Sequence, residues 1–262
     1  MGNPFVQRLR DRDTLIGYWS VLDSPVSTER IARVGYDYVA IDVQHGLVDY
    51  RGMLHGLLAI DAGGSIRRTP VDAAPTVGLV RVESNNATAI GKAFDAGAAG
   101  VIVPLVDSPE DAARAVSASR YPPVGIRSYG PMRSGLRVGP VPADAHQQTA
   151  VLAMIETRDA LENVVDICRV DGLTGVYVGP SDLSLAIGGA FPGDPAVSVE
   201  FEEALAAVSS AAADAGIAAG IHCPDGHTAH KRLKQGFTFA SIASDLTHLE
   251  IVAASHLEIA RG

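Results

Sequence analysis

Eight short apolar runs recur along the chain, and within each run hydrophobicity is continuous rather than alternating. Two of them read "YDYVAIDV" and "AGVIVPLV". This unbroken pattern is typical of parallel strands that are covered on both faces. We therefore predict eight strands, within residues 15–22, 36–43, 76–82, 99–106, 151–156, 173–179, 216–223 and 237–244.

Amphipathic helical segments separate these runs. "SPEDAARAV" opens on Ser108, a favoured N-cap residue, followed by Pro109 and two acids in the first turn. "FEEALAAVSSAAADAG" is rich in helix formers and closes on Gly216. Eight strand-then-helix units predict the α/β class and a (β/α)8 TIM barrel, with residues 1–262 as a single domain. A doubly wound open sheet is the alternative, although no glycine-rich phosphate motif follows the first strand.

One connection is unusually long and irregular. It reads "YPPVGIRSYGPMRSGLRVGPVPAD", residues 121–144, and separates the fourth and fifth strands. We predict a βα loop with little regular structure, and long ordered loops in compact domains tend to be functional. Arg127 and Arg133 within it are candidates to face a substrate pocket.

The composition limits the kinds of partner that the protein is expected to bind. The chain has 262 residues, 47% of them hydrophobic, and a net charge of -9 with no cluster of Lys or Arg. Nucleic acid and anionic membrane surfaces are therefore not expected partners. The charged N-terminal segment has no apolar signal core, and no apolar run approaches the about 18 residues of a membrane span. We expect a cytoplasmic protein, in which Cys168 and Cys223 are small buried hydrophobes rather than a disulfide or metal site.

Carboxylates follow the fifth and sixth runs. Catalytic residues of barrels lie at the carboxyl ends of the strands, where Glu156 and Asp182 are expected. Neighbouring strands lie about 5 Å apart, so the two acids can converge on one Mg²⁺ or Mn²⁺. Either acid alone could instead be a solvated loop residue or a helix cap. In "GPSDLS", Gly179 and Pro180 make a tight turn, and the amides that follow can bind an anion.

The second and third runs end in further ionisable groups. Arg81 lies inside the apolar "LVRVE", so it requires an anionic partner, either a structural acid such as Glu83 or a substrate. Asp42 and His45 form a candidate pair in which the carboxylate orients an imidazole base. A structural histidine is the alternative.

Two further strand ends are weaker candidates. His222 and Cys223 end the seventh run, but a soft thiolate does not match a site of oxygen ligands. Ser244 and Asp245 end the eighth run, where they could lie at the rim of a site.

Six quoted segments together resemble the HpcH/HpaI aldolase/citrate lyase family, in its metal-dependent 4-hydroxy-2-oxoheptanedioate aldolase branch. They are "VAIDVQHGLVD", "LVRVESNN", "FDAGAAGVIVPLVDSPEDA", "YPPVGIRSYGP", "MIETRDALENV" and "VYVGPSDLSLAIG", which run in family order between residues 15 and 245. The resemblance implies a barrel, often hexameric, with exchanged C-terminal helices. It also implies a divalent metal (Mg²⁺, Mn²⁺ or Co²⁺) that binds pyruvate or a related 2-oxoacid.

The resemblance also assigns roles to residues. It implies metal ligation by Glu156 and Asp182, catalysis by His45 with Asp42 as its paired carboxylate, 2-oxoacid binding by Arg81, and substrate-carboxylate binding by the backbone around Gly179, Ser181 and Asp182. The chain departs from the family at Gln44, where many members have Glu. It also departs at "GIRSYG", where relatives often show a second glycine after the arginine, so the aldehyde is not predicted.

The expected function is a metal-dependent aldolase that reversibly cleaves a 4-hydroxy-2-oxoacid to pyruvate and an aldehyde through an enolate. No lysine ends a predicted strand, so a Schiff base is not required. An oxaloacetate decarboxylase or an enolate-using synthase on the same fold is the alternative, and a binding protein without activity is a third. The C-terminal "THLEIVAASHLEIARG" has an apolar face, and a homo-oligomer, hexamer or trimer, is expected.

Overall fold

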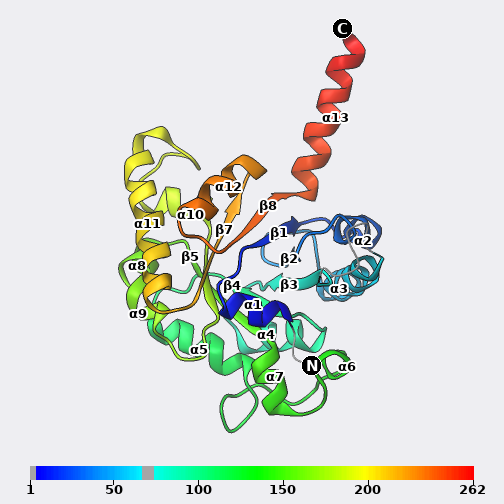
Figure 1. Ribbon diagram of the computed structural model, residues 1–262, viewed down its shortest axis with the longest axis vertical. Coiled ribbons are helices and arrows are strands. Elements are labelled where there is room, and N and C mark those ends of the chain that lie inside the picture. Colours follow the sequence, from blue (N-terminus) through cyan, green and yellow to red (C-terminus); the bar gives the residue numbers. More distant parts are fainter. Residues whose placement is uncertain (1–3, 67–73) are drawn as a thin grey trace.

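The computed structural model describes residues 4–66 and 74–262, and its centre is a closed barrel of eight parallel strands in chain order (Figure 1). All eight predicted strands are confirmed. Each is shorter than its apolar run or shifted by a residue, because the flanking apolar residues belong to turns. The strands are β1 (Leu15–Ser20), β2 (Tyr38–Asp42), β3 (Val77–Arg81), β4 (Gly100–Val103), β5 (Ala150–Ile155), β6 (Gly175–Val178), β7 (Ala218–Cys223) and β8 (Phe239–Ser244).

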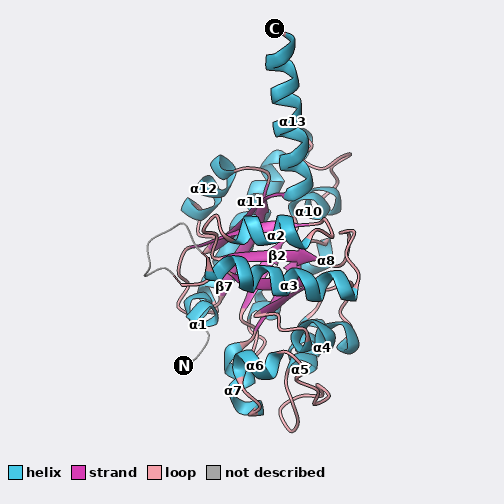
Figure 2. Cartoon of the chain, turned by 90° about the vertical axis from the view of Figure 1, so that its right-hand side faces the viewer, coloured by secondary structure: helices cyan, strands magenta, loops and turns pink. Residues whose placement is uncertain are grey.

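Helices surround the strands on the outside of the barrel (Figure 2), so the predicted (β/α)8 fold is confirmed. Ser108 caps its helix as expected, because its hydroxyl accepts the N–H of Asp111 at 3.1 Å. The helices are α1 (Pro4–Arg10), α2 (Pro25–Ala32), α3 (Tyr50–Ser65), α4 (Ala87–Asp95), α5 (Pro109–Ser119), α6 (Ser134–Val138), α7 (Pro142–Gln148), α8 (Arg158–Glu162), α9 (Val164–Cys168), α10 (Pro180–Ala186), α11 (Ser198–Asp214), α12 (Gly226–Lys234) and α13 (Asp245–Arg261), with a 3₁₀ turn at Pro195–Val197.

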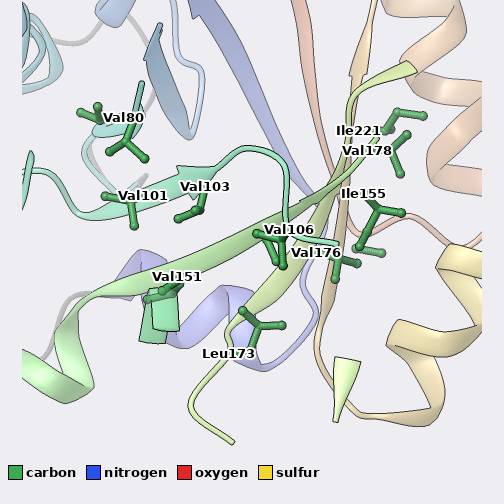
Figure 3. Packing of buried hydrophobic residues seen from close by; sticks show 14 of the residues in the cluster. Val80, Val101, Val103, Val106, Val151, Ile155, Leu173, Val176, Val178 and Ile221 are labelled. Atoms are coloured by element: carbon green, nitrogen blue, oxygen red, sulfur yellow. The ribbon is translucent and has the colours of Figure 1, made fainter. Parts of the chain in front are cut away.

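The strands separate two apolar cores. The outer core lies between strands and helices, and Figure 3 shows valines of β4 and β6 among its members. The inner core fills the barrel and is closed at the amino ends of the strands by α1, whose Phe5 contacts Tyr38 with ring centroids 5.7 Å apart. Because side chains alternate between the faces of a strand, each strand contributes to both cores.

The segment 121–144 corrects one prediction. Helix α5 carries the chain from the carboxyl end of β4 back to the amino end of the barrel, so the residues after it form an αβ connection, not a βα loop. The segment contains α6 and the start of α7, so it is more regular than expected. Arg127 pairs with Asp95 at 2.6 Å and Arg133 pairs with Asp61. Neither arginine lines the cavity that opens at the carboxyl ends of the strands, which is described below.

The expected C-terminal helix is present and projects from the barrel (Figures 1 and 2). Beyond Asp245 its residues are exposed. Asp245 itself is buried, and its carboxylate accepts hydrogen bonds from the Ser20 hydroxyl and the Val21 N–H, both at 2.9 Å. Asp245 therefore joins β1 to the start of α13, and it is a structural residue rather than a rim residue.

Two smaller expectations concern burial and the membrane. Cys168 and Cys223 are buried free thiols, as predicted. Within residues 4–66 and 74–262, no helix has both the length and the apolar character that crossing a bilayer requires.

Candidate active site

A cavity of about 220 Å³ opens at the carboxyl ends of the strands. It brings together five residues that the sequence singled out for catalysis or binding, while Asp42 and Glu156 are buried behind its wall. The cavity is lined by Trp19, His45, Arg81, Met154, Tyr177, Gly179, Pro180, Ser181, Asp182 and His222.

Strand alternation explains why polar side chains converge there. Ala40, Leu79 and Met154 belong to the inner core of the barrel. The residues two positions further along, Asp42, Arg81 and Glu156, point to the same side, because the side-chain period of a strand is two. The inward rows of β2, β3 and β5 thus change from apolar to ionisable where these strands reach the open end.

Arg81 is neutralised by Asp42, so the structural acid beside it is Asp42 and not Glu83, which was the example that the sequence offered. The two residues are direct neighbours in the β2–β3 register, and the guanidinium donates to the carboxylate from Nε at 2.9 Å and from Nη2 at 2.5 Å. Burial alone would raise the pKa of Asp42, but the hydrogen bond and charge of Arg81 hold it below its usual value. Arg81 is therefore fixed at the cavity wall as a cation, whereas Glu83 is exposed.

Asp42 contacts His45 through the backbone rather than through the imidazole. Its Oδ1 accepts the N–H groups of Gln44 at 3.0 Å and His45 at 3.2 Å, which shapes the turn after β2. Gly46 continues the turn because a Cβ there would lie 2.2 Å from the Asp42 carbonyl oxygen. The His45 side chain is exposed at the rim of the cavity. The expected carboxylate–imidazole hydrogen bond is thus replaced by a turn that presents the ring.

Glu156 and Asp182 form a like-charged pair. Glu156 is 3% exposed, and its Oε1 accepts the N–H of Leu105 at 2.8 Å. Burial raises the pKa of Glu156, and the charge of Asp182 raises it further, although the Leu105 N–H opposes both effects. In the described part of the chain Glu156 has no ion-pair partner, and no three His, Cys, Asp or Glu side chains cluster around a metal position.

This pair fits a hard divalent cation. A cation would compensate the two carboxylates, and Mg²⁺ characteristically takes only one or two protein carboxylates, with its remaining ligands from water and substrate. Gly179 keeps the space beside Glu156 open, because a Cβ there would lie 2.7 Å from Oε2. Ser181 and Asp182 are in the first turn of α10, where backbone N–H groups have no partner inside the helix.

The floor of the cavity contains Trp19 and Tyr177, which the sequence did not single out as functional, and His222, which was only a weaker candidate. Trp19 stacks on Tyr177 with ring centroids 5.7 Å apart, and the Arg81 guanidinium lies over the Trp19 ring at 5.2 Å. His222 also faces the cavity, whereas Cys223 is part of the outer core. The sequence interpretation treated His222 and Cys223 together, although strand alternation separates them. That alternation was the signal that could have found His222.

Comparison with known proteins agrees with this geometry. Residues 15–250 match the model of the HpcH/HpaI aldolase/citrate lyase family. A hydroxypyruvate/pyruvate aldolase from Rhizorhabdus wittichii is 40% identical over 254 residues, which are 95% of each chain. A 4-hydroxy-2-oxovalerate aldolase from Rhodococcus jostii is 36% identical over 94% of this chain and 91% of its own.

The solved structures show the same relationship. The crystal structure of an HpcH/HpaI aldolase/citrate lyase family protein from Burkholderia cenocepacia superposes with a TM-score of 0.87 at 30% identity, over 99% of this chain and 100% of the other. Sequence and fold therefore agree along nearly the whole chain, and the resemblance drawn from the six sequence segments is confirmed. This protein belongs to the HpcH/HpaI aldolase/citrate lyase family and is an enzyme of the carbon–carbon lyase class.

Proposed function

We propose that this protein is a metal-dependent aldolase that reversibly cleaves a 4-hydroxy-2-oxoacid to pyruvate, or a related 2-oxoacid, and an aldehyde. The observation that carries the proposal is the convergence of Arg81, His45 and the Glu156–Asp182 pair around one cavity. The relatives named as pyruvate-type and 4-hydroxy-2-oxovalerate aldolases support the same substrate class.

Arg81 and the first turn of α10 would bind the oxoacid end of the substrate. Arg81 is held from behind by Asp42, so its position is fixed before substrate arrives. A guanidinium can hydrogen-bond both a carboxylate and the neighbouring keto oxygen. Ser181 and Asp182 line the same cavity, and the N–H groups of this first turn would suit the carboxylate.

Glu156 and Asp182 would hold the divalent metal, Mg²⁺, Mn²⁺ or Co²⁺. When bound, such an ion supplies a Lewis acid that polarises the keto oxygen. The chain's own contribution is a carboxylate pair in which Glu156 is already oriented by the Leu105 N–H.

His45 would move the proton. It takes the proton of the 4-hydroxyl as the C3–C4 bond breaks, so that C4 becomes the aldehyde carbonyl. The bonding electrons form the C2–C3 double bond of the enolate, and Arg81 stabilises the negative oxygen in place. Protonation at C3 then gives pyruvate. No lysine is among the described residues that line the cavity, so no Schiff base enters this sequence.

The test is pyruvate release from a panel of 4-hydroxy-2-oxoacids, with Mg²⁺ or Mn²⁺ and with a chelator. We expect cleavage that chelation abolishes and added metal restores; cleavage that resists chelation would contradict the metal assignment. Oxaloacetate decarboxylation without aldol cleavage would favour the decarboxylase, and condensation without cleavage would favour the synthase. Arg81→Ala should lower kcat/KM by about 100-fold, or about 3 kcal/mol, and the exposed Arg114→Ala serves as the control.

We also propose that the active form is a homo-oligomer, a hexamer or trimer, in which α13 packs on a second copy or is exchanged with it. The support is that α13 is exposed beyond Asp245 and carries Leu249 and Val252, which are 59% and 53% exposed. An isolated helix of this length is marginally stable in water, so packing against a partner would stabilise it.

A further inference from the structure

His222 lines the cavity but has no part in the mechanism above. Strand β7 directs its ring inward, where it makes an edge contact with Trp19 at 5.4 Å between centroids. Its Nδ1 is buried and has no hydrogen-bond partner among the residues that the structure describes. Nδ1 has almost no accessible surface, so Nε2 is the ring nitrogen that His222 can present to a hydrogen-bonding group in the cavity.

The burial of His222 favours the neutral form of its imidazole. Burial lowers its pKa to about 4, and the charge of Arg81 acts in the same direction, although Asp42 opposes them. A neutral imidazole carries one hydrogen-bond donor and one acceptor. A hydroxyl group also both donates and accepts, whereas a methyl group does neither.

The depth of His222 indicates which substrate part it meets. Trp19 and Tyr177, which form the floor beside it, are buried, whereas His45, Ser181 and Asp182 are exposed at the rim. Arg81, which would bind the oxoacid, lies over the ring of the floor residue Trp19, so the donor would occupy the floor side of the cavity and leave the rim side to the aldehyde. The side chains of the floor therefore contact the donor rather than the aldehyde.

The position of Arg81 indicates which donor atom lies nearest. Arg81, which would hold the C1 carboxylate and the C2 keto oxygen, lies over the same Trp19 ring that His222 contacts. His222 is thus one aromatic ring away from the oxoacid-binding group. C3 is bonded directly to C2, so a substituent on C3 would lie within reach of the floor when the opposite side of C3 faces the aldehyde at the rim.

We propose that His222 hydrogen-bonds a hydroxyl group on C3 of the donor and selects a 3-hydroxy-2-oxoacid, such as hydroxypyruvate, over pyruvate. The inference rests on the proposed function, because it assumes that the cavity binds a 2-oxoacid donor. With pyruvate bound, the C3 methyl leaves the imidazole unpaired. A site with a buried polar group discriminates against the analogue that lacks the matching hydroxyl.

The first test measures kcat/KM for hydroxypyruvate and for pyruvate with one fixed aldehyde, in wild type, His222→Leu and His222→Asn. We expect wild type to prefer hydroxypyruvate. His222→Leu should lower kcat/KM for hydroxypyruvate on the order of 10- to 100-fold, and it should change kcat/KM for pyruvate by less than about 3-fold. His222→Asn should retain part of the preference, because an amide also donates and accepts. Equal losses for both donors, an unchanged ratio or a wild-type preference for pyruvate would overturn the proposal.

The second test measures binding, so that it does not depend on turnover. Calorimetric titration of the Mg²⁺-loaded protein with each oxoacid should show tighter binding of hydroxypyruvate, lost in His222→Leu. In ¹⁵N-histidine NMR spectra, the His222 ring resonances should shift with hydroxypyruvate and not with pyruvate. Met154→Leu, which alters the same wall without a hydrogen-bonding group, should change both affinities alike.

The two tests distinguish a failure of the proposed aldolase function from a failure of the proposed role of His222. If neither donor is turned over, the proposed aldolase function fails, while a hydroxypyruvate preference that His222→Leu abolishes still supports the role of His222. If both donors are turned over and the variants leave the affinity ratio unchanged, the function stands and the role of His222 is refuted.

Discussion

The Asp42 carboxylate accepts hydrogen bonds from Arg81, from the Trp19 indole N–H at 3.3 Å, and from two backbone N–H groups of the turn that carries His45. Its negative charge is what allows Arg81 to be buried at 8% exposure as a cation. One side chain therefore fixes both the oxoacid-binding group and the turn that presents the proposed base.

Asp42→Asn should lower the free energy of unfolding by about 3 kcal/mol at pH 7, because it leaves the Arg81 charge buried without a counter-ion. The folded-state pKa of Asp42 is depressed, so its stabilisation is complete above the unfolded value of about 3.9 and is lost as pH falls through the folded value. In urea unfolding, the free energies of unfolding of wild type and Asp42→Asn should differ by a constant amount from pH 7 to about pH 4. The difference should become smaller between about pH 4 and pH 3.

Asp13→Asn is the control for this prediction, because it removes a half-exposed partner of Arg8 and should change stability by less than about 1 kcal/mol. A difference between wild type and Asp42→Asn that stays constant down to pH 3 would show that the charge of Asp42 is not the stabilising feature.

The sequence predicted that Arg81 needs an acidic partner, but it did not identify which acid this is. The apolar surroundings of Arg81 correctly required an acid nearby, but Glu83 and a substrate were the candidates considered. The choice of Asp42 depends on strand register, which pairs Asp42 directly with Arg81 across β2 and β3. Register is a long-range property, and one sequence does not state it.

At the scale of elements, the junction between β6 and α10 is built around the absence of a side chain. Gly179 lies between the strand and the helix that carries Asp182, and its Cα faces the Glu156 carboxylate. Gly179→Ala should displace that carboxylate and weaken Mg²⁺ or Mn²⁺ binding on the order of 10-fold, the usual effect of disturbing the support of a metal ligand.

Metal titration by calorimetry, with circular dichroism to verify the fold, measures this effect. Gly226→Ala is the matched control, because Gly226 also begins a helix after a barrel strand and has open space where a Cβ would be placed. Equal metal affinity in Gly179→Ala and wild type would remove Glu156 from the proposed metal site.

The sequence predicted which segments form strands and helices better than it predicted the end of the barrel at which a connecting segment lies. Hydrophobic runs identified all eight strands, and the Ser108 cap identified the start of α5. The segment 121–144 was assigned to the wrong end of the barrel because its length suggested function. Chain direction decides the matter physically: a helix returns the chain to the amino end, so whatever follows α5 and precedes β5 lies there.

At the scale of the whole molecule, α13 is the feature that the barrel itself does not explain. The helix leaves the body after Asp245 and is exposed from there to the C-terminus (Figure 1). Leu249 and Val252 are one turn apart, so they share a face. Apolar side chains on a projecting helix are typical of a surface that a partner covers.

The double substitution Leu249→Glu and Val252→Glu should convert the proposed oligomer to a monomer. Both side chains are exposed in the single chain, so charges there should leave its folding little changed, whereas burying two carboxylates between subunits is strongly unfavourable. Light scattering coupled to size-exclusion chromatography gives the mass, and circular dichroism verifies that the barrel is folded.

Val199→Glu places one carboxylate on an apolar residue of α11 that is 72% exposed, and it should leave the assembly intact. An oligomer that survives the double substitution would place the subunit interface elsewhere, and a monomeric wild type would refute the assembly itself.

Activity measured on the same samples shows whether the partner subunit is needed to complete the active site. The cavity, with Arg81, Glu156 and Asp182, is formed within one chain. A folded monomer that retains aldolase activity would therefore show that the partner stabilises α13 without completing the site.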